Sequence, residues 1–269
     1  MSEYQYYEFR AIDRTLTAKE MQELRAISTR AQITKTSFTN EYNFGNLRGN
    51  PIAHLEKYFD VFYYTSNLGS SRLAFRFPKK LLELKEIKQF FIGSPYMELK
   101  ESKDYIIIDF TVEDEEYAER DYDSSYPKLD SLISLRADIL NGDYRSLYLG
   151  YLLSKKLDEK KAKGKEIEIS PNLASLTPAL KSFVKFIYLE PSIIKDAIKT
   201  SKTDESVLDN DSLLINWIGK TNSKTKNDII YSFLKDTNPT LRIELLKKFR
   251  LSTNTQTSEA PKSKKRKKS

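Results

Sequence analysis

The stretch from Asn50 to Phe77 constrains the fold of this chain more than any other segment. Asn50 and Pro51 are typical of a helix start, because Asn can cap a helix and Pro fits its first position. Apolar residues then recur at steps of three and four, which predicts an amphipathic helix that ends at Gly69. The residues in this phase are Ile52, Leu55, Phe59, Phe62 and Ser66.

A strand is predicted directly after this helix. Leu73, Phe75 and Phe77 alternate with Arg72, Ala74 and Arg76. Such alternation is expected of a strand with one buried face. An amphipathic helix followed at once by an amphipathic strand indicates a layer of helices on a sheet.

The rest of the N-terminal half predicts further pieces of that layer. A capping box at Thr17 and Glu20 marks a helix that ends near Ser28. Further strands are expected at 4–12, 31–44, 97–100 and 105–112, with a bulge or hairpin inside 31–44 and a short helix at 78–90. The order predicts an α+β fold with helices on one face of a mixed sheet, and a ferredoxin-like arrangement is the nearest simple topology.

The composition changes after this half and suggests four parts. Residues 1–112 form the expected α+β domain, and acidic residues crowd 113–127, which reads as a linker. Residues 128–250 show helical periodicity with short connections, which predicts an all-α domain of helical hairpins. Residues 251–269 are polar and are expected to be a disordered basic tail.

The net charge of +7 over 269 residues comes mostly from that tail. Six cations without an acid stand at its end, so residues 1–260 carry 7 − 6 = +1. The candidate polyanion-binding residues are Lys262, Lys264, Lys265, Arg266, Lys267 and Lys268. A flexible basic segment can bind phosphate backbones, while the nearly neutral body gives no sign of a nucleic-acid face.

Several classes of site are excluded or disfavoured by residue content. The chain has no cysteine and a single histidine, His54, so disulfides, thiolate metal sites and multi-histidine zinc sites are excluded. We expect no metal and no cofactor, since the glycines form no phosphate-binding loop. No apolar run spans a membrane and no signal-peptide pattern is seen, so a cytoplasmic location is expected.

Four segments form a distinctive pattern: Tyr6-Tyr7-Glu8-Phe9 with Asp13-Arg14-Thr15-Leu16-Thr17, Glu56-Lys57-Tyr58-Phe59-Asp60, Asn67-Leu68-Gly69 and the segment 135–145. In these segments the chain resembles a bacterial protein family of uncharacterised activity. The resemblance extends to about Arg250 and leaves out the basic tail. Because the family has no assigned activity, the resemblance implies no functional residue.

Two groups of side chains are candidates for a surface site. The first is an aromatic and basic patch on predicted strands, made of Tyr4, Tyr6, Arg10, Arg72 and Arg76. Such a patch could stack single-stranded bases; the favoured alternative is that the C-terminal helices cover this face. The second flanks the turn at Gly142 and is either a local charge network or a recognition patch: Arg136, Asp138, Asp143 and Arg145.

Three functions are compatible with these features. The first is a non-enzymatic adaptor that binds another protein, favoured by the lack of a catalytic motif and by 17 tyrosines, which suit interfaces. The second is a nucleic-acid-associated protein that binds through the tail. The third is an enzyme with a carboxylate, arginine and tyrosine site, which a pocket joining those groups would favour. The oligomeric state stays open.

Overall fold

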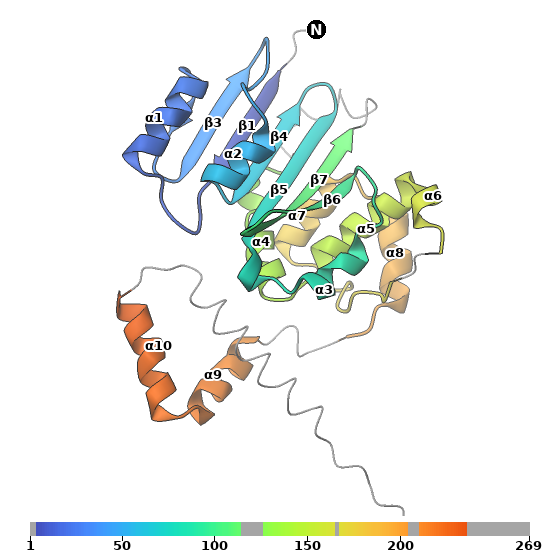
Figure 1. The fold of residues 1–269 in the computed structure, drawn as a ribbon. Helices are drawn as coiled ribbons and strands as arrows, with labels where there is room; N and C mark the ends of the chain where they lie inside the picture. The colour runs from blue at the N-terminus through green and yellow to red at the C-terminus, as the bar shows by residue number, and fades with distance from the viewer. Residues whose placement is uncertain (1–3, 114–125, 165–166, 204–209, 236–269) are drawn as a thin grey trace, which may run out of the picture. The chain divides into compact units, whose positions relative to one another are not determined.

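The structure is a computed structural model that describes residues 4–113, 126–164, 167–203 and 210–235 (Figure 1). Most of the predicted acidic linker, the end of the predicted all-α domain and the whole basic tail lie outside the described residues. The chain divides into two compact units, Met1–Val207 and Leu208–Ser269. The boundary between these units follows Val207, whereas we predicted a boundary at 113–127.

Strands and helices alternate through the first unit. The strands are β1 (Gln5–Arg10), β2 (Gln32–Ile33), β3 (Ser37–Tyr42), β4 (Val61–Ser66), β5 (Ser70–Pro78), β6 (Met97–Glu101) and β7 (Tyr105–Glu113). The helices are α1 (Ala18–Ile27), α2 (Pro51–Tyr58), α3 (Leu84–Ile87), α4 (Ser134–Leu140), α5 (Arg145–Leu157), α6 (Glu159–Ala162), α7 (Pro178–Phe186) and α8 (Pro191–Thr200). Short 3-10 turns are η1 (Lys79–Leu81), η2 (Lys88–Phe90) and η4 (Leu129–Ser131). The fold is therefore α+β, as predicted.

One seven-stranded sheet has the order β2-β3-β1-β4-β5-β7-β6. Every paired neighbour is antiparallel, so the mixed sheet that we predicted is wrong. The reason lies in the connections. β3 and β4 are parallel and joined through α2, but β1 lies between them; β5 and β6 are likewise separated by β7. The sheet contains two such split crossovers and is larger than the four-stranded ferredoxin-like arrangement that we expected.

Helices α1 and α2 cover one face of the sheet. The core there joins Leu24 of α1 and Leu55 of α2 to Phe9, Phe38 and other buried side chains. The ring centroids of Phe9 and Phe62 are 4.6 Å apart, and those of Phe9 and Phe59 are 5.1 Å apart. This aromatic cluster holds the two N-terminal helices on the β3-β1-β4 part of the sheet.

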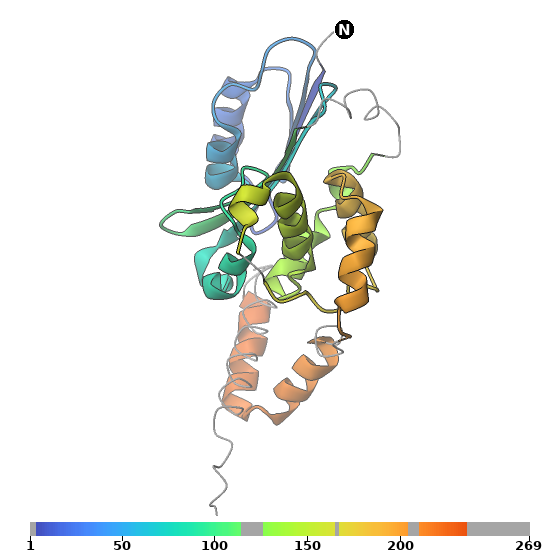
Figure 2. The same ribbon diagram turned by 90° about the vertical axis from the view of Figure 1, so that its right-hand side faces the viewer.

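The opposite face is covered by helices from residues 126–203 (Figure 2). Phe183 of α7 packs on Phe110 of β7 with ring centroids 4.9 Å apart, and Phe186 packs 5.8 Å from Tyr63 of β4. Gly150 brings α5 so close that an added Cβ would meet the Met97 side chain. The prediction of helices on one face only is therefore wrong, because segments that we assigned to an all-α domain form a third layer.

The central stretch differs from its prediction in its second half. Asn50 caps α2 as expected, its side chain accepting from the Ile52 N–H at 2.8 Å. The helix ends at Tyr58, however, and Gly69, at φ +78°, turns β4 into β5. The reason is a run of β-branched and aromatic residues from Val61 to Thr65 that favours a strand. The apolar positions that we predicted to be buried on the helix are buried in the observed helix and strand as well.

Other local predictions are confirmed. The Thr17–Glu20 capping box is present, and α1 ends with Ser28 as its C-cap. The segment 31–44 is a hairpin of β2 and β3. The strands predicted at 97–100 and 105–112 are present as β6 and β7, which pair as a hairpin.

The second unit contributes two described helices, α9 (Asn210–Lys220) and α10 (Ser223–Lys235). The Asn222 side chain accepts from the Thr225 N–H at 2.9 Å and so caps α10. Ile215 is 69% exposed and Tyr231 is 62% exposed, so these helices present apolar side chains outward. Within the described residues, no helix is long and apolar enough to cross a membrane.

Candidate interaction surface

The structure separates the predicted aromatic and basic patch onto two faces of the sheet. Tyr7 lies opposite Tyr64, and Tyr64 lies opposite Arg72, so these three side chains share the face covered by α1 and α2. Tyr6 is one residue out of step and projects from the other face. Arg10 shares the parity of Tyr6, whereas Arg76 shares that of Arg72. A single base-stacking platform is therefore not formed.

Tyr6 and Arg10 contact their own strand and the third layer. The Tyr6 O–H donates to Glu8 at 2.9 Å, and Arg10 pairs with Glu8 at 2.6 Å and with Asp130 at 3.2 Å. Burial, followed by the Glu8 carboxylate, raises the pKa of Tyr6. Tyr4 lies just before β1, and its N–H donates to the Asn67 side chain at 2.8 Å. These side chains take part in internal packing, which agrees with the favoured alternative.

Arg72 is held by a carboxylate on the neighbouring strand. Its Nε and Nη2 donate to the two oxygens of Asp109 at 2.9 and 2.6 Å, and Lys100 reaches the same carboxylate at 3.3 Å. The hydrogen bond to Asp109 raises the pKa of Arg72. The Asp109 side chain is only 1% exposed, so the pair fixes β5 to β7.

Arg76 belongs to a buried charge network that the sequence did not reveal. We call Asp13, Asp60, Arg76 and Arg136 the Asp60 network. Arg76 donates to Asp60 at 2.7 Å, and the other Asp60 oxygen accepts the N–H groups of Ile12 and Asp13 at 2.6 and 2.8 Å. Burial favours the neutral acid, but Arg136 and Arg76 outweigh burial and hold the pKa of Asp60 below its usual value.

Arg136 joins the third layer to this network. Its Nη1 and Nη2 donate to both oxygens of Asp13 at 2.9 and 2.7 Å, and its Nε donates to the Arg76 carbonyl at 2.9 Å. Arg136 is 3% exposed and lies on α4. The network thus fixes α4 against the ends of β1 and β5, which is a structural role.

The predicted charge network at Gly142 is present in part. Arg145 donates to Asp143 with Nη2 at 2.6 Å and to the carbonyls of Asn172 and Ser175. Burial, followed by the Asp143 carboxylate, raises the pKa of Asp138 to about 6. Arg136 does not join this group, because it pairs with Asp13 instead.

A cavity of about 450 Å³ lies beside this turn, lined in part by Asp143, Tyr144, Arg145 and Glu168. It brings together the three residue types that we named as favouring an enzyme. However, Arg145 is bound to Asp143, and the Tyr144 O–H donates to Glu86 at 2.7 Å. These side chains are therefore already bonded within the protein, where they stabilise the turn, and a ligand would have to compete for them.

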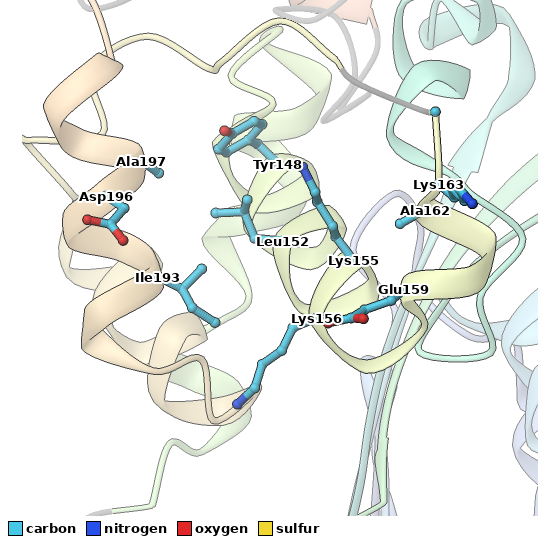
Figure 3. Close-up of a pocket in the computed structure, with 11 residues that line it drawn as sticks. Tyr148, Leu152, Lys155, Lys156, Glu159, Ala162, Lys163, Ile193, Asp196 and Ala197 are labelled. Atoms are coloured by element: carbon cyan, nitrogen blue, oxygen red, sulfur yellow. The ribbon is translucent and has the colours of Figure 1, made fainter.

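An open groove of about 1060 Å³ lies between α5, α6 and α8 (Figure 3). We call it the helix groove. Its apolar lining comes from Tyr148 and Leu152 of α5, Ala162 of α6, and Ile193 and Ala197 of α8. Leu152 and Ile193 are half-buried and face each other across the groove (Figure 3).

Charged side chains form the rim of the helix groove. Lys155, Lys156 and Lys163 lie on it together with Glu159 and Asp196. Lys156 pairs with Glu190, and Asp196 pairs with Lys199 at 2.8 Å. Lys155 and Lys163 are exposed and make no ion pair with any described residue. The rim thus keeps two cations beside an aliphatic floor.

Sequence reasoning did not identify this groove. The apolar face of α5 was visible in Tyr148 and Leu152, and the run 155–163 contains five lysines. To predict that Ile193 lies beside them, one must know that α8 packs next to α5, and no local sequence pattern indicates this. The combination of a lysine run with an amphipathic helix was the available signal.

The remaining candidates are easily placed. The His54 Nε2 lies 2.9 Å from the Arg48 carbonyl on an exposed turn, which agrees with a structural role. Among the described residues, no group of three or more His, Asp and Glu side chains could hold a metal ion. Lys262, Lys264, Lys265, Arg266, Lys267 and Lys268 lie outside the described residues, so polyanion binding by the tail stays a prediction.

Comparisons with models of protein families, with curated proteins and with solved structures found no match to the chain. The resemblance to a bacterial family therefore stays a prediction.

Proposed function

We propose that this protein is a non-enzymatic interaction module that binds another protein through the helix groove. The observation that carries the proposal is an open cavity of about 1060 Å³ with an aliphatic floor and a lysine-bearing rim. Binding sites are typically concave and mostly apolar, with a few charged groups that set orientation. The helix groove has these properties.

The rest of the first unit supports this proposal by serving as a scaffold. Arg72, Arg76, Arg136 and Arg145 are each bound to a carboxylate of the same chain. Their charges are committed to holding strands and helices together. The groove walls, α5 and α8, are in contrast open at Leu152 and Ile193, where a partner can contact them.

The test is site-specific photocrosslinking in living cells of the source organism. A photoreactive phenylalanine analogue at Ile193 should form one dominant protein adduct, which mass spectrometry identifies. The same analogue at Gln22, an exposed position on α1, serves as the control. The identified protein, once purified, should bind the wild-type chain and lose at least tenfold in affinity with Ile193→Asp.

Equal adducts at both positions, or affinity unchanged by Ile193→Asp, would overturn the proposal. Ile193→Asp is suited to this test because the side chain is only half-buried. Circular dichroism and thermal unfolding of the variant check that its fold is kept.

Two alternatives keep specific support. The basic tail, with six cations, supports association with nucleic acid. The cavity of about 450 Å³ beside Tyr144 and Arg145 supports an enzyme. Native mass spectrometry of the purified chain would test this alternative by detecting a bound metabolite. The cysteine-free sequence supports a cytoplasmic location.

A further inference from the structure

We infer that the helix groove binds an acidic amphipathic helix of a partner protein. This inference rests on the proposed function and adds the chemistry of the partner. Three properties of the groove lead to it: the secondary structure of its walls, the spacing of its apolar residues and the charge of its rim.

The walls favour a helical ligand over an extended one. Both long walls are helices, whose interior N–H and C=O groups already bond within the helix. An extended peptide would find no backbone partners there and would leave its own polar groups unpaired over an aliphatic floor. A helix satisfies its backbone internally and needs only side-chain contacts.

The apolar residues of each wall are one helical turn apart. Tyr148 and Leu152 are four residues apart on α5, and Ile193 and Ala197 are four apart on α8. Rows with this spacing form the ridges between which another helix packs, and Leu152 and Ile193 are the half-buried members of these rows that a partner can contact. From Tyr148 to Lys156 the wall is about 12 Å long, so about two turns of a partner helix fit it.

The charge around the groove favours an acidic partner. The segments 155–163 and 190–200, which carry the rim, contain seven lysines against four carboxylates. Their net charge is 7 − 4 = +3, whereas the residues 1–260 as a whole carry +1, so the rest of that stretch carries −2. Lys155 and Lys163 make no ion pair with a described residue and can pair with Glu or Asp of the partner.

A nucleic acid suits the groove less well. No arginine is among the residues that line it, although arginine is the usual bidentate phosphate ligand. Its aromatic residue, Tyr148, is 4% exposed and offers no free face on which a base could stack. An aliphatic floor with lysines at the edge fits an amphipathic helix.

Selection from a displayed library of random 18-residue peptides tests the inference. The full-length wild-type chain and a full-length Lys155→Glu/Lys163→Glu variant serve as parallel baits. Both baits keep the basic tail, so non-specific attraction of acidic peptides cancels in the comparison. Both substitutions lie on exposed side chains and should leave the fold intact.

Peptides enriched on the wild type should carry apolar residues at i, i+3 or i+4 and i+7, with Glu or Asp beside them. A labelled peptide from that pool should bind the double variant at least tenfold more weakly. The matched control, Lys35→Glu/Lys85→Glu, makes the same change of charge at exposed positions outside the groove lining and should bind within about twofold of wild type.

Enriched peptides that are basic, or that lack helical periodicity, would overturn the inference while leaving the crosslinking test of the proposed function intact. Equal loss in the control variant would also overturn it. A (dT)20 oligonucleotide that displaces the peptide, with an affinity sensitive to Lys155 and Lys163, would assign the groove to nucleic acid instead. Ile193→Asp must weaken the selected peptide too, or the peptide binds elsewhere.

Discussion

The Asp60 network and the helix groove both concentrate charge, and they differ in the residues that carry it. In the network, the Arg76 and Arg136 side chains are at most 4% exposed and bonded to carboxylates and carbonyls. In the groove, Lys155 and Lys163 are exposed and make no ion pair with a described residue. Arginine offers several donors in a rigid fork, which suits a buried joint, whereas lysine keeps a hydrated charge at the surface.

The comparison shows that charge by itself does not mark a functional site. A buried and paired charged side chain stabilises the fold, whereas an exposed one without an ion pair is available to bind a partner. The following predictions test this distinction, from the largest expected effect to the smallest.

The largest effect is expected from Asp60→Ala. The change removes the acceptor of Arg76 and of two backbone N–H groups, while both arginines stay buried without it. Removing one member of a buried ion pair typically costs ~3–5 kcal/mol. Urea unfolding at pH 7 should show a loss of that size in the free energy of unfolding.

Arg14→Ala is the control, because its pair with Glu20 lies at the surface, where such pairs are worth under about 1 kcal/mol. Similar losses for the two variants would mean that water reaches the Asp60 network. The low pKa of Asp60 adds a pH test: its contribution is present above about pH 4 and is lost as the pH falls below that value.

The second prediction concerns the two sides of α5. Gly150 faces the sheet, and an added Cβ would lie 2.5 Å from Met97 Sδ and 2.7 Å from Phe110 Cε1. Gly150→Val should therefore lower the free energy of unfolding by ~1–3 kcal/mol through overpacking. Lys155→Val places the same side chain on the groove side of the helix and should cost under about 0.5 kcal/mol. Equal costs would contradict the close contact of α5 with the sheet.

The third prediction uses pH. Burial raises the pKa of Asp138 to about 6, so folding favours its protonated form. The resulting stabilisation is present below about pH 4 and is lost as the pH rises through 6. Above pH 6 the folded protein carries the cost of a partly buried, ionised carboxylate, and Asp138→Asn removes this cost. The variant should be more stable by ~1 kcal/mol at pH 7.5, a small gain because the side chain is partly exposed. Thermal unfolding at pH 4 should show no such gain, and a gain equal at both pH values would contradict the assignment.

Local signals in the sequence predicted local structure well. The capping box at Thr17 and the cap at Asn50 depend on side chains that reach two or three residues along the chain, so the pattern contains all of their partners. The helix predicted to run to Gly69 was wrong beyond Tyr58, because apolar residues at steps of three and four also fit a helix followed by a strand. There, β propensity from Val61 to Thr65 decided the structure.

Long-range features could not be predicted. Arg136 pairs with Asp13, 123 residues earlier, and nothing near either residue indicates the other. The faces of Arg72 and Tyr6 depend on strand register, and a shift of one residue moves a side chain to the opposite face. The helix groove depends on where α8 packs against α5. The sequence shows the lysines and the apolar face of α5, but it does not show that α8 packs beside them to form a groove.

The smallest effect on stability is expected from deleting the residues after Ala260, and it separates the basic tail from the helix groove. The tail carries six cations, while the rest of the chain has a net charge of +1. Each phosphate contact releases counterions, so binding of the full chain to duplex DNA should weaken with salt at a log–log slope of up to about −5. Anisotropy across a salt series measures this slope.

The shortened chain should lose nearly all DNA binding and should keep its thermal stability, since the deleted residues are six cations, two serines and one proline and offer little apolar surface to bury. It should also bind the groove-selected peptide within about twofold of the full chain, because Lys155 and Lys163 are retained. DNA binding that survives the deletion with a similar slope would place a basic surface on the rest of the chain. If Lys155→Glu/Lys163→Glu then abolished that binding, the groove itself would be the nucleic-acid site, and the contrast between buried arginines and exposed lysines would stand with a different partner.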